Sequence, residues 1–140
     1  MASRNLPITF REEETKQLIN LAQAGESASI VGVSGAGKSN LFNHLFDRDV
    51  QKHYLGQAAD EYIFVRINFH YAADFSSRSV FSLMLEQFEA LDTLTAEDSQ
   101  RIEELHEALL NAGDDKLKVQ RYFRLAVRKL LGRNQRRLIF

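Results

Sequence analysis

A glycine-rich segment carries the residue types and the spacing that could do chemistry. It reads Gly32-Val33-Ser34-Gly35-Ala36-Gly37-Lys38-Ser39 and matches the pattern G-x-x-x-x-G-K-[ST] at every fixed position. Glycines at positions 35 and 37 let the backbone curl where a Cβ atom would clash. Successive N–H groups of such a curl point at phosphate oxygens, so the segment predicts a loop that binds a nucleoside triphosphate.

The two residues that end the pattern carry the expected charge chemistry. The ammonium group of Lys38 is expected to bridge the β- and γ-phosphates as a catalytic cation, and the hydroxyl of Ser39 to ligate Mg²⁺. The predicted cofactors are therefore ATP and Mg²⁺. The residues predicted to bind nucleotide through this loop are Gly32, Val33, Ser34, Gly35, Ala36, Gly37, Lys38, Ser39 and Asn40.

The segments on either side of the loop have the character needed to position it. Residues 28–33 are short, apolar and rich in β-branched side chains, which predicts a buried strand. A helix is expected from Lys38, with Leu41, Phe42 and Leu45 on one face. The N-terminus of that helix would add its positive dipole end to the phosphate site.

The remaining chain alternates helical and strand patterns. Thr9 and Glu12 form a capping box that predicts a helix over residues 10–24. Residues 61–69 give the strongest strand pattern, whereas the polar segment 47–59 predicts a loop. Further helices are expected over residues 80–91, from Thr95 to Gly113 and over 117–131, and a further strand begins at residue 137. The order predicts an α/β fold, with a parallel sheet in a three-layer α/β/α core.

Composition excludes several classes of protein. The chain has 140 residues, which suits one domain, and it has no cysteine, which excludes disulfides and thiolate metal sites. No apolar run approaches the ~20 residues that span a bilayer, and the N-terminus lacks the apolar core of a signal peptide. The sequence predicts a cytoplasmic location with no membrane partner.

Charge is distributed unevenly along the chain. Residues 89–115 contain nine acidic residues and one basic residue, Arg101, whereas residues 116–137 contain nine basic residues and no acidic one. One interpretation is a solvated basic helix that is paired with an acidic neighbour. The other is a strip over residues 116–129 that binds DNA or a protein partner. Both stay open from the sequence.

The N-terminal third resembles a known family. Phe10-Arg11-Glu12-Glu13-Glu14, followed by a helix and then by residues 28–39, looks like the start of AAA+ ATPases of the origin-recognition and STAND types. Those proteins begin with a short R-E-x-E box, and residues around it contact adenine. The resemblance implies nucleotide contacts at Phe10 and Arg11, with Pro7 and Ile8 beside them. It is specific only at the phosphate loop, although residues 62–68 and 75–91 are similar to the family's second strand and helix.

The same resemblance implies a Walker B strand, which is an apolar strand that ends in an acidic pair and holds Mg²⁺. Residues 137–140 look like the first half of that strand, and no carboxylate follows them. We therefore expect residues 1–140 to be the N-terminal part of a P-loop ATPase domain, truncated at this strand. Such a piece would bind ATP with little hydrolysis, and a homo-oligomer is an expected assembly.

Three functions fit these residues. The leading hypothesis is an ATPase that acts as a nucleotide-driven switch or motor. The alternative is a nucleotide-gated interaction module that binds DNA or a protein without hydrolysis. A small-molecule kinase is the third, because its phosphate loops look similar. Those loops usually lie within the first ten or so residues, however, and here 31 residues precede Gly32.

Overall fold

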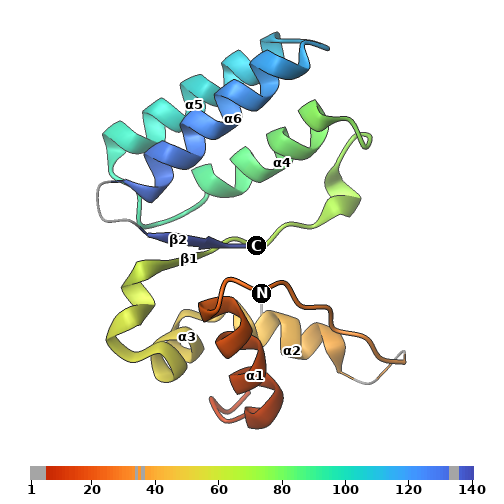
Figure 1. The fold of residues 1–140 in the computed structure, drawn as a ribbon, viewed down its shortest axis with the longest axis vertical. Helices are drawn as coiled ribbons and strands as arrows, with labels where there is room; N and C mark the ends of the chain where they lie inside the picture. Colours follow the sequence, from red (N-terminus) through yellow and green to blue (C-terminus); the bar gives the residue numbers. More distant parts are fainter. Residues whose placement is uncertain (1–5, 34, 36, 133–135) are drawn as a thin grey trace. The chain divides into compact units, whose positions relative to one another are not determined.

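The chain forms two compact units in the computed structural model, which describes residues 6–33, 35, 37–132 and 136–140. Unit 1 comprises Met1–Tyr62 with Ile139, and unit 2 comprises Ile63–Leu138 with Phe140. The described elements follow in the order α1 (Glu12–Gln23), α2 (Lys38–Leu45), α3 (Arg48–Leu55), the 3₁₀ helix η1 (Gly56–Glu61), β1 (Tyr62–Phe64), the 3₁₀ helix η2 (Phe69–Tyr71), α4 (Ser77–Glu89), α5 (Ala96–Asn111), α6 (Lys116–Leu131) and β2 (Arg137–Ile139) (Figure 1).

Unit 1 is a small helical unit built from α1, α2 and α3. The first turn of α1 is acidic, which suits the positive end of a helix, and Glu12 pairs with Lys16 at 2.9 Å. Asp47 caps α3, because its side chain accepts the backbone N–H of Asp49 at 2.9 Å. The buried side chains of this unit are Thr15, Ile19, Leu41, His44, Val50, Gln51, Leu55, Ala59 and Tyr62.

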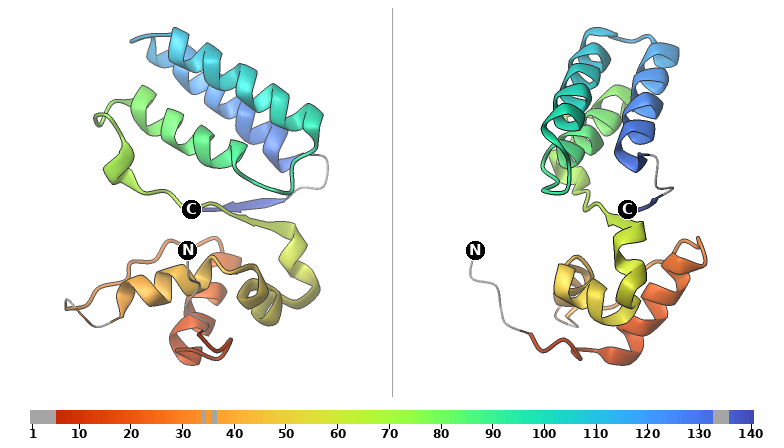
Figure 2. Two further views of the ribbon diagram at one scale, coloured as in Figure 1. Left: turned by 180° about the vertical axis from the view of Figure 1, so that it is seen from behind. Right: turned by 90° about the vertical axis from the view of Figure 1, so that its left-hand side faces the viewer.

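Unit 2 contains the larger apolar core. Helices α4, α5 and α6 pack against one another, and Figure 2 shows α5 and α6 side by side. Side-chain oxygens of Ser76, Thr95 and Asp115 cap the three helices by accepting backbone N–H groups. The core residues are Ile63, Val65, Leu85, Phe88, Ile102, Leu105, Leu109, Val119, Ala126 and Leu130. None of the described helices is long and apolar enough to cross a membrane.

Strands β1 and β2 form a two-stranded parallel sheet, and the chain passes from one strand to the other through α4, α5 and α6. The prediction of strands near residues 61–69 and at residue 137 is confirmed, although β1 is shorter than its sequence pattern. This small sheet within a mostly helical chain is compatible with part of an α/β P-loop fold. A three-layer core remains a prediction.

The predicted strand over residues 28–33 is wrong for this structure. The segment is irregular, and it exposes 91% of Val31 and 78% of Val33. A strand needs a neighbour that supplies the other half of its hydrogen-bond ladder. No described segment forms a strand ladder with residues 28–33, and Val31 and Val33 stay in solvent.

Two further predictions in unit 1 are also wrong. The segment 47–59 is α3 and η1 rather than a loop, because the Asp47 cap starts a helix that buries Val50 and Leu55. Thr9 does not cap α1, because the helix begins two residues later behind Arg11, which has a left-handed backbone and makes no side-chain capping bond. The helix itself, predicted over residues 10–24, is confirmed as Glu12–Gln23.

Candidate functional site

The glycine-rich segment has the backbone conformation that its glycines allow. Gly35 has φ 82° and Gly37 has φ 84°, both in the left-handed region that side chains disfavour. Gly37 is the N-cap of α2, so the loop leads directly into the first turn of a helix. The predicted contacts Ser34 and Ala36 lie outside the described residues.

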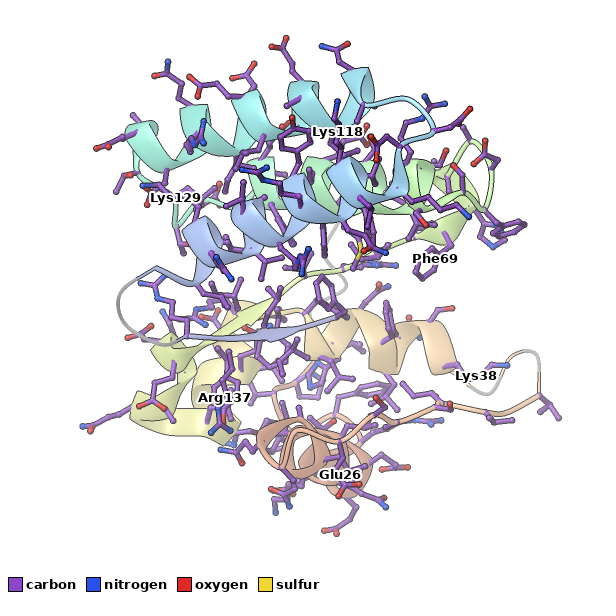
Figure 3. All side chains as sticks on the ribbon, turned by 45° about the horizontal axis from the view of Figure 1, so that its top comes forward. Glu26, Lys38, Phe69, Lys118, Lys129 and Arg137 are labelled. Carbon is purple, nitrogen blue, oxygen red and sulfur yellow. The ribbon has the colours of Figure 1, made fainter. Side chains whose placement is uncertain are left out.

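A cavity of ≈390 Å³ lies over this turn and is lined by Gly35, Gly37, Lys38, Ser39 and Asn40. The first N–H groups of a helix have no carbonyl partner within the helix, and they form a ready anion site. The structure thus gathers five of the predicted nucleotide-binding residues around one hollow. Figure 3 labels Lys38, the first residue of α2.

Lys38 is turned back onto the loop in this structure. Its ammonium group donates a hydrogen bond to the carbonyl oxygen of Gly32, six residues earlier. The bond links the segment before the loop to the start of α2 and keeps the positive charge beside the cavity. A phosphate that bound here would offer the ammonium a charged acceptor in place of a neutral one, and hydrogen bonds to charged groups are stronger.

Arg11 lies against the same turn. A Cβ atom at Gly37 would stand 3.4 Å from Nη2 of Arg11, so the guanidinium lies against a loop position that has no side chain. Arg11 has φ 45° and ψ 53°, a left-handed conformation that is uncommon for a residue with a side chain. That conformation turns the chain into α1 at the point where Arg11 meets the loop.

Three polar contacts hold the segment that carries Phe10 and Arg11. The carbonyl oxygen of Ile8 accepts hydrogen bonds from Nε2 of His44 at 3.0 Å and from the hydroxyl of Tyr54 at 3.2 Å. The hydroxyl of Thr15, which is fully buried, donates to the carbonyl oxygen of Phe10 at 3.2 Å. These contacts tie the segment to α1, α2 and α3.

Phe10 packs between this framework and Arg11. Its ring meets the His44 imidazole edge-on with centroids 5.5 Å apart, and the Arg11 guanidinium carbon lies 6.0 Å from its centroid. The sequence singled out Phe10 and Arg11 but missed His44, Tyr54 and Thr15, which position them. The position of His44 between Leu41 and Leu45, on the inner side of the helix, was the available signal.

The residues present fit Mg²⁺ only in part. Ser39 is exposed at the cavity and could supply one hydroxyl ligand, which suits an ion that keeps several waters and phosphate oxygens. In the described part of the chain, no group of three His, Asp or Glu residues could hold a metal ion. Any Mg²⁺ bound by this unit would therefore depend mainly on phosphates and water.

A loop with left-handed glycines, a lysine and a serine at the start of a helix is the arrangement found in phosphate-binding sites. Residues 7–140 match the family model of the AAA ATPase domain. The chain belongs to that family and is a P-loop ATPase domain of the AAA type. No curated protein and no solved structure matches the chain.

Proposed function

We propose that this domain binds ATP with Mg²⁺ in the cavity at the start of α2, through Gly32, Val33, Gly35, Gly37, Lys38, Ser39 and Asn40, with Ser34 and Ala36 completing the loop. The observation that carries the proposal is the common location of the left-handed glycines, the Lys38 ammonium and the Ser39 hydroxyl around one hollow. Backbone N–H groups and Lys38 would hold the phosphates, and Ser39 would ligate the metal ion.

The Arg11–Gly37 contact supports a switch function of the origin-recognition or STAND type. A nucleotide on the loop would lie beside the guanidinium of Arg11, the residue that immediately precedes α1. Phosphate binding would therefore bias the Phe10–Arg11 segment, and that segment is coupled to His44 and Tyr54 through Ile8. In this proposal Phe10 and Arg11 contact the bound nucleotide, and the domain reports its nucleotide state through α1.

Isothermal titration of the 140-residue chain with Mg²⁺-ATP tests the site. Lys38→Ala should weaken ATP binding at least about tenfold, because a charge-assisted hydrogen bond contributes roughly 1.5–3 kcal/mol. The matched control is Lys52→Ala, which removes an exposed lysine from α3 of the same unit. Equal affinities for the two variants would sink the assignment of the site.

Product analysis separates the ATPase from its alternatives. A switch or motor ATPase releases phosphate, a small-molecule kinase yields a phosphorylated acceptor, and a nucleotide-gated module yields neither. Phe10→Ala supplies a second comparison, because loss of an adenine contact should lower affinity for ATP more than for inorganic triphosphate. If the affinities for ATP and for inorganic triphosphate fall equally, Phe10 positions Arg11 and does not contact the adenine base.

A nucleic-acid partner for α6 is a second candidate, and one observation favours it. Arg121, Arg124 and Arg128 follow at helical spacing, are exposed, and have no ion pair or hydrogen bond within the described residues. Lys129 differs, because it pairs with Asp98 of α5 at 3.0 Å. Thus the acidic neighbour neutralises Lys129 but not the arginine stripe, which consists of Arg121, Arg124 and Arg128.

Salt dependence tests that stripe. Binding of a DNA duplex through three phosphate contacts should fall by about 0.9 log units per contact for each log unit of salt. Replacement of all three arginines by glutamine should remove that slope, whereas Lys116→Gln should change it by no more than one contact. Absence of binding at low salt would leave the stripe as a solvated face.

A further inference from the structure

A hydrogen-bonded chain of Ser82, His106 and Glu89 joins α4 to α5. The Ser82 hydroxyl lies 2.7 Å from Nε2 of His106, and Nδ1 of His106 lies 2.9 Å from Oε1 of Glu89. The His106 side chain is 12% exposed and that of Glu89 is 30% exposed. All three residues belong to unit 2 and lie outside the phosphate loop.

The carboxylate decides which way the hydrogens point. An ionised glutamate can only accept, so Nδ1 of His106 carries the proton that it donates to Glu89. The other nitrogen of the neutral ring is then an acceptor, and the Ser82 hydroxyl donates to it. This is the order of donor, base and orienting carboxylate that activates a serine for nucleophilic attack.

A cavity beside Ser82 could admit a small substrate. A cavity of ≈340 Å³ is lined by Ser82 together with Tyr71, Arg78, Ser79, Leu83 and Leu110, among others. Arg78 lies four residues before Ser82, on the same face of α4. Glu86 lies four residues after Ser82 and also lines the cavity, so the wall carries one cation and one carboxylate beside the serine. Tyr71 and the two leucines give the same wall an apolar part.

We propose that Ser82 is an acyl-accepting nucleophile for small carboxylic esters of aromatic alcohols. The Ser82 oxygen bonds to the ester carbonyl carbon while Nε2 of His106 takes the hydroxyl proton. The ester C–O bond then breaks, and the proton passes from His106 to the departing alcohol. In the second half, water attacks the acyl carbon and gives a proton to His106. The bond between the acyl carbon and the Ser82 oxygen breaks, His106 returns the proton to that oxygen, and the carboxylic acid leaves. Glu89 is a positioning residue, which holds the imidazole tautomer.

Ser79 is the internal comparison for this site. It lines the same cavity, but its hydroxyl lies 3.2 Å from that of Ser76. No histidine stands beside it among the described residues. Two serines on one helix therefore face one cavity, and only Ser82 has a base within hydrogen-bond distance.

Covalent labelling of the full chain with a fluorophosphonate tests the proposal, because Ser82 would displace fluoride and keep the phosphonyl group. Peptide mapping should find the adduct on Ser82. Ser82→Ala should abolish it, and Ser99→Ala, on α5 and outside the residues that line the cavity, should leave its rate unchanged. Absence of an adduct from Ser82, or equal labelling of Ser76, Ser79 and Ser82, would overturn the proposal.

Two further variants separate chemistry from packing. His106→Gln keeps a donor and an acceptor but removes the base, so the rate of p-nitrophenyl acetate hydrolysis should fall by about a hundredfold or more. Glu89→Gln should lower that rate while wild-type circular dichroism is retained. If His106→Gln fails to fold, the site of labelling in the wild-type chain alone decides. An unchanged rate in a folded His106→Gln variant would show that the hydrogen-bonded chain only joins two helices.

Discussion

The phosphate loop of unit 1 and the helical core of unit 2 are built in opposite ways. The loop exposes an apolar side chain at Val33, and its described contacts are glycine backbone angles and the hydrogen bond from Lys38 to the Gly32 carbonyl. Unit 2 buries Phe88 completely, and the Phe88 ring stacks near those of Phe123 and Phe140. A site that must receive phosphates keeps its backbone open, whereas the unit that supports helices needs apolar contact. Mutations in the core of unit 2 should therefore lower the free energy of unfolding, whereas mutations in the loop should mainly lower the affinity for ATP.

The largest effect is expected in the core of unit 2. Phe88→Ala should lower the free energy of unfolding by about 3–5 kcal/mol, because it leaves a cavity among well-packed rings and aliphatic side chains. Urea denaturation followed by circular dichroism measures the loss. Val31→Ala in the segment before the loop is the comparison, and it should change stability by less than about 0.5 kcal/mol. Similar losses for both would remove the distinction between the two regions.

Glycine substitutions sharpen the comparison within unit 1. Gly37→Ala and Gly25→Ala each place a side chain at positive φ, so each should destabilise by about 1–2 kcal/mol. The two substitutions differ in their surroundings. A Cβ atom at position 37 would contact Arg11, whereas a Cβ atom at position 25 would have no other atom within 4 Å. Calorimetric titration should show weaker ATP binding for Gly37→Ala and unchanged binding for Gly25→Ala. Loss of affinity in both variants would mean that strain, rather than contact with Arg11, controls the site.

A smaller effect is expected from the contact that holds Phe10. Thr15→Val keeps the shape of the buried side chain but removes the hydroxyl that donates to the Phe10 carbonyl. The free energy of unfolding should fall by about 0.5–1.5 kcal/mol. Thr93→Val, at an exposed position, is the control. Thermal melts decide, and a Thr15→Val variant as stable as the control would show that the Phe10 segment needs no such hydrogen bond.

The smallest effect concerns acid stability at the start of α4. Hydrogen bonds from the Ser76 side chain and backbone, and then from Ser79, lower the pKa of Asp74 to about 2. Because the folded-state pKa lies below the ordinary value of 3.8, the stabilisation is present above pH 3.8 and is lost as the pH falls through about 2. Between pH 5 and pH 2, the wild-type melting temperature should fall slightly more than that of Asp74→Asn. Parallel curves would contradict this role of Asp74.

The elements that could be predicted from the sequence are those with local causes. The glycine spacing indicated the loop and the start of α2, Thr95 marked the start of α5, and Gly132 marked the end of α6. Such signals need only the residues beside them. The short helix α3 was missed because its eight residues are too few for a clear periodic pattern.

Features that depend on distant partners could not be predicted in the same way. The β-branched side chains of Ile30, Val31 and Val33 favour a strand, but a strand forms only when another segment pairs with it. The contact of Arg11 with Gly37 and the hydrogen bonds of His44 and Tyr54 to the Ile8 carbonyl join residues far apart in the chain, so no local pattern indicates them. For the candidate site, the sequence indicated the residues proposed to bind nucleotide. It did not indicate His44, Tyr54 and Thr15, which hold the Phe10–Arg11 segment in place.

The exposed segment before the loop has a practical consequence for handling the protein. Residues 28–33 have no charge and no proline, and Val31 and Val33 face solvent on a backbone that forms no strand ladder with the described residues. Short segments of this kind template intermolecular strand pairing and amyloid-like assembly. Light scattering of the isolated chain should therefore rise with concentration and fall when Val31 is replaced by lysine. The stretch that leads into the phosphate loop is thus also the stretch that limits how concentrated, and for how long, the protein can be kept in solution.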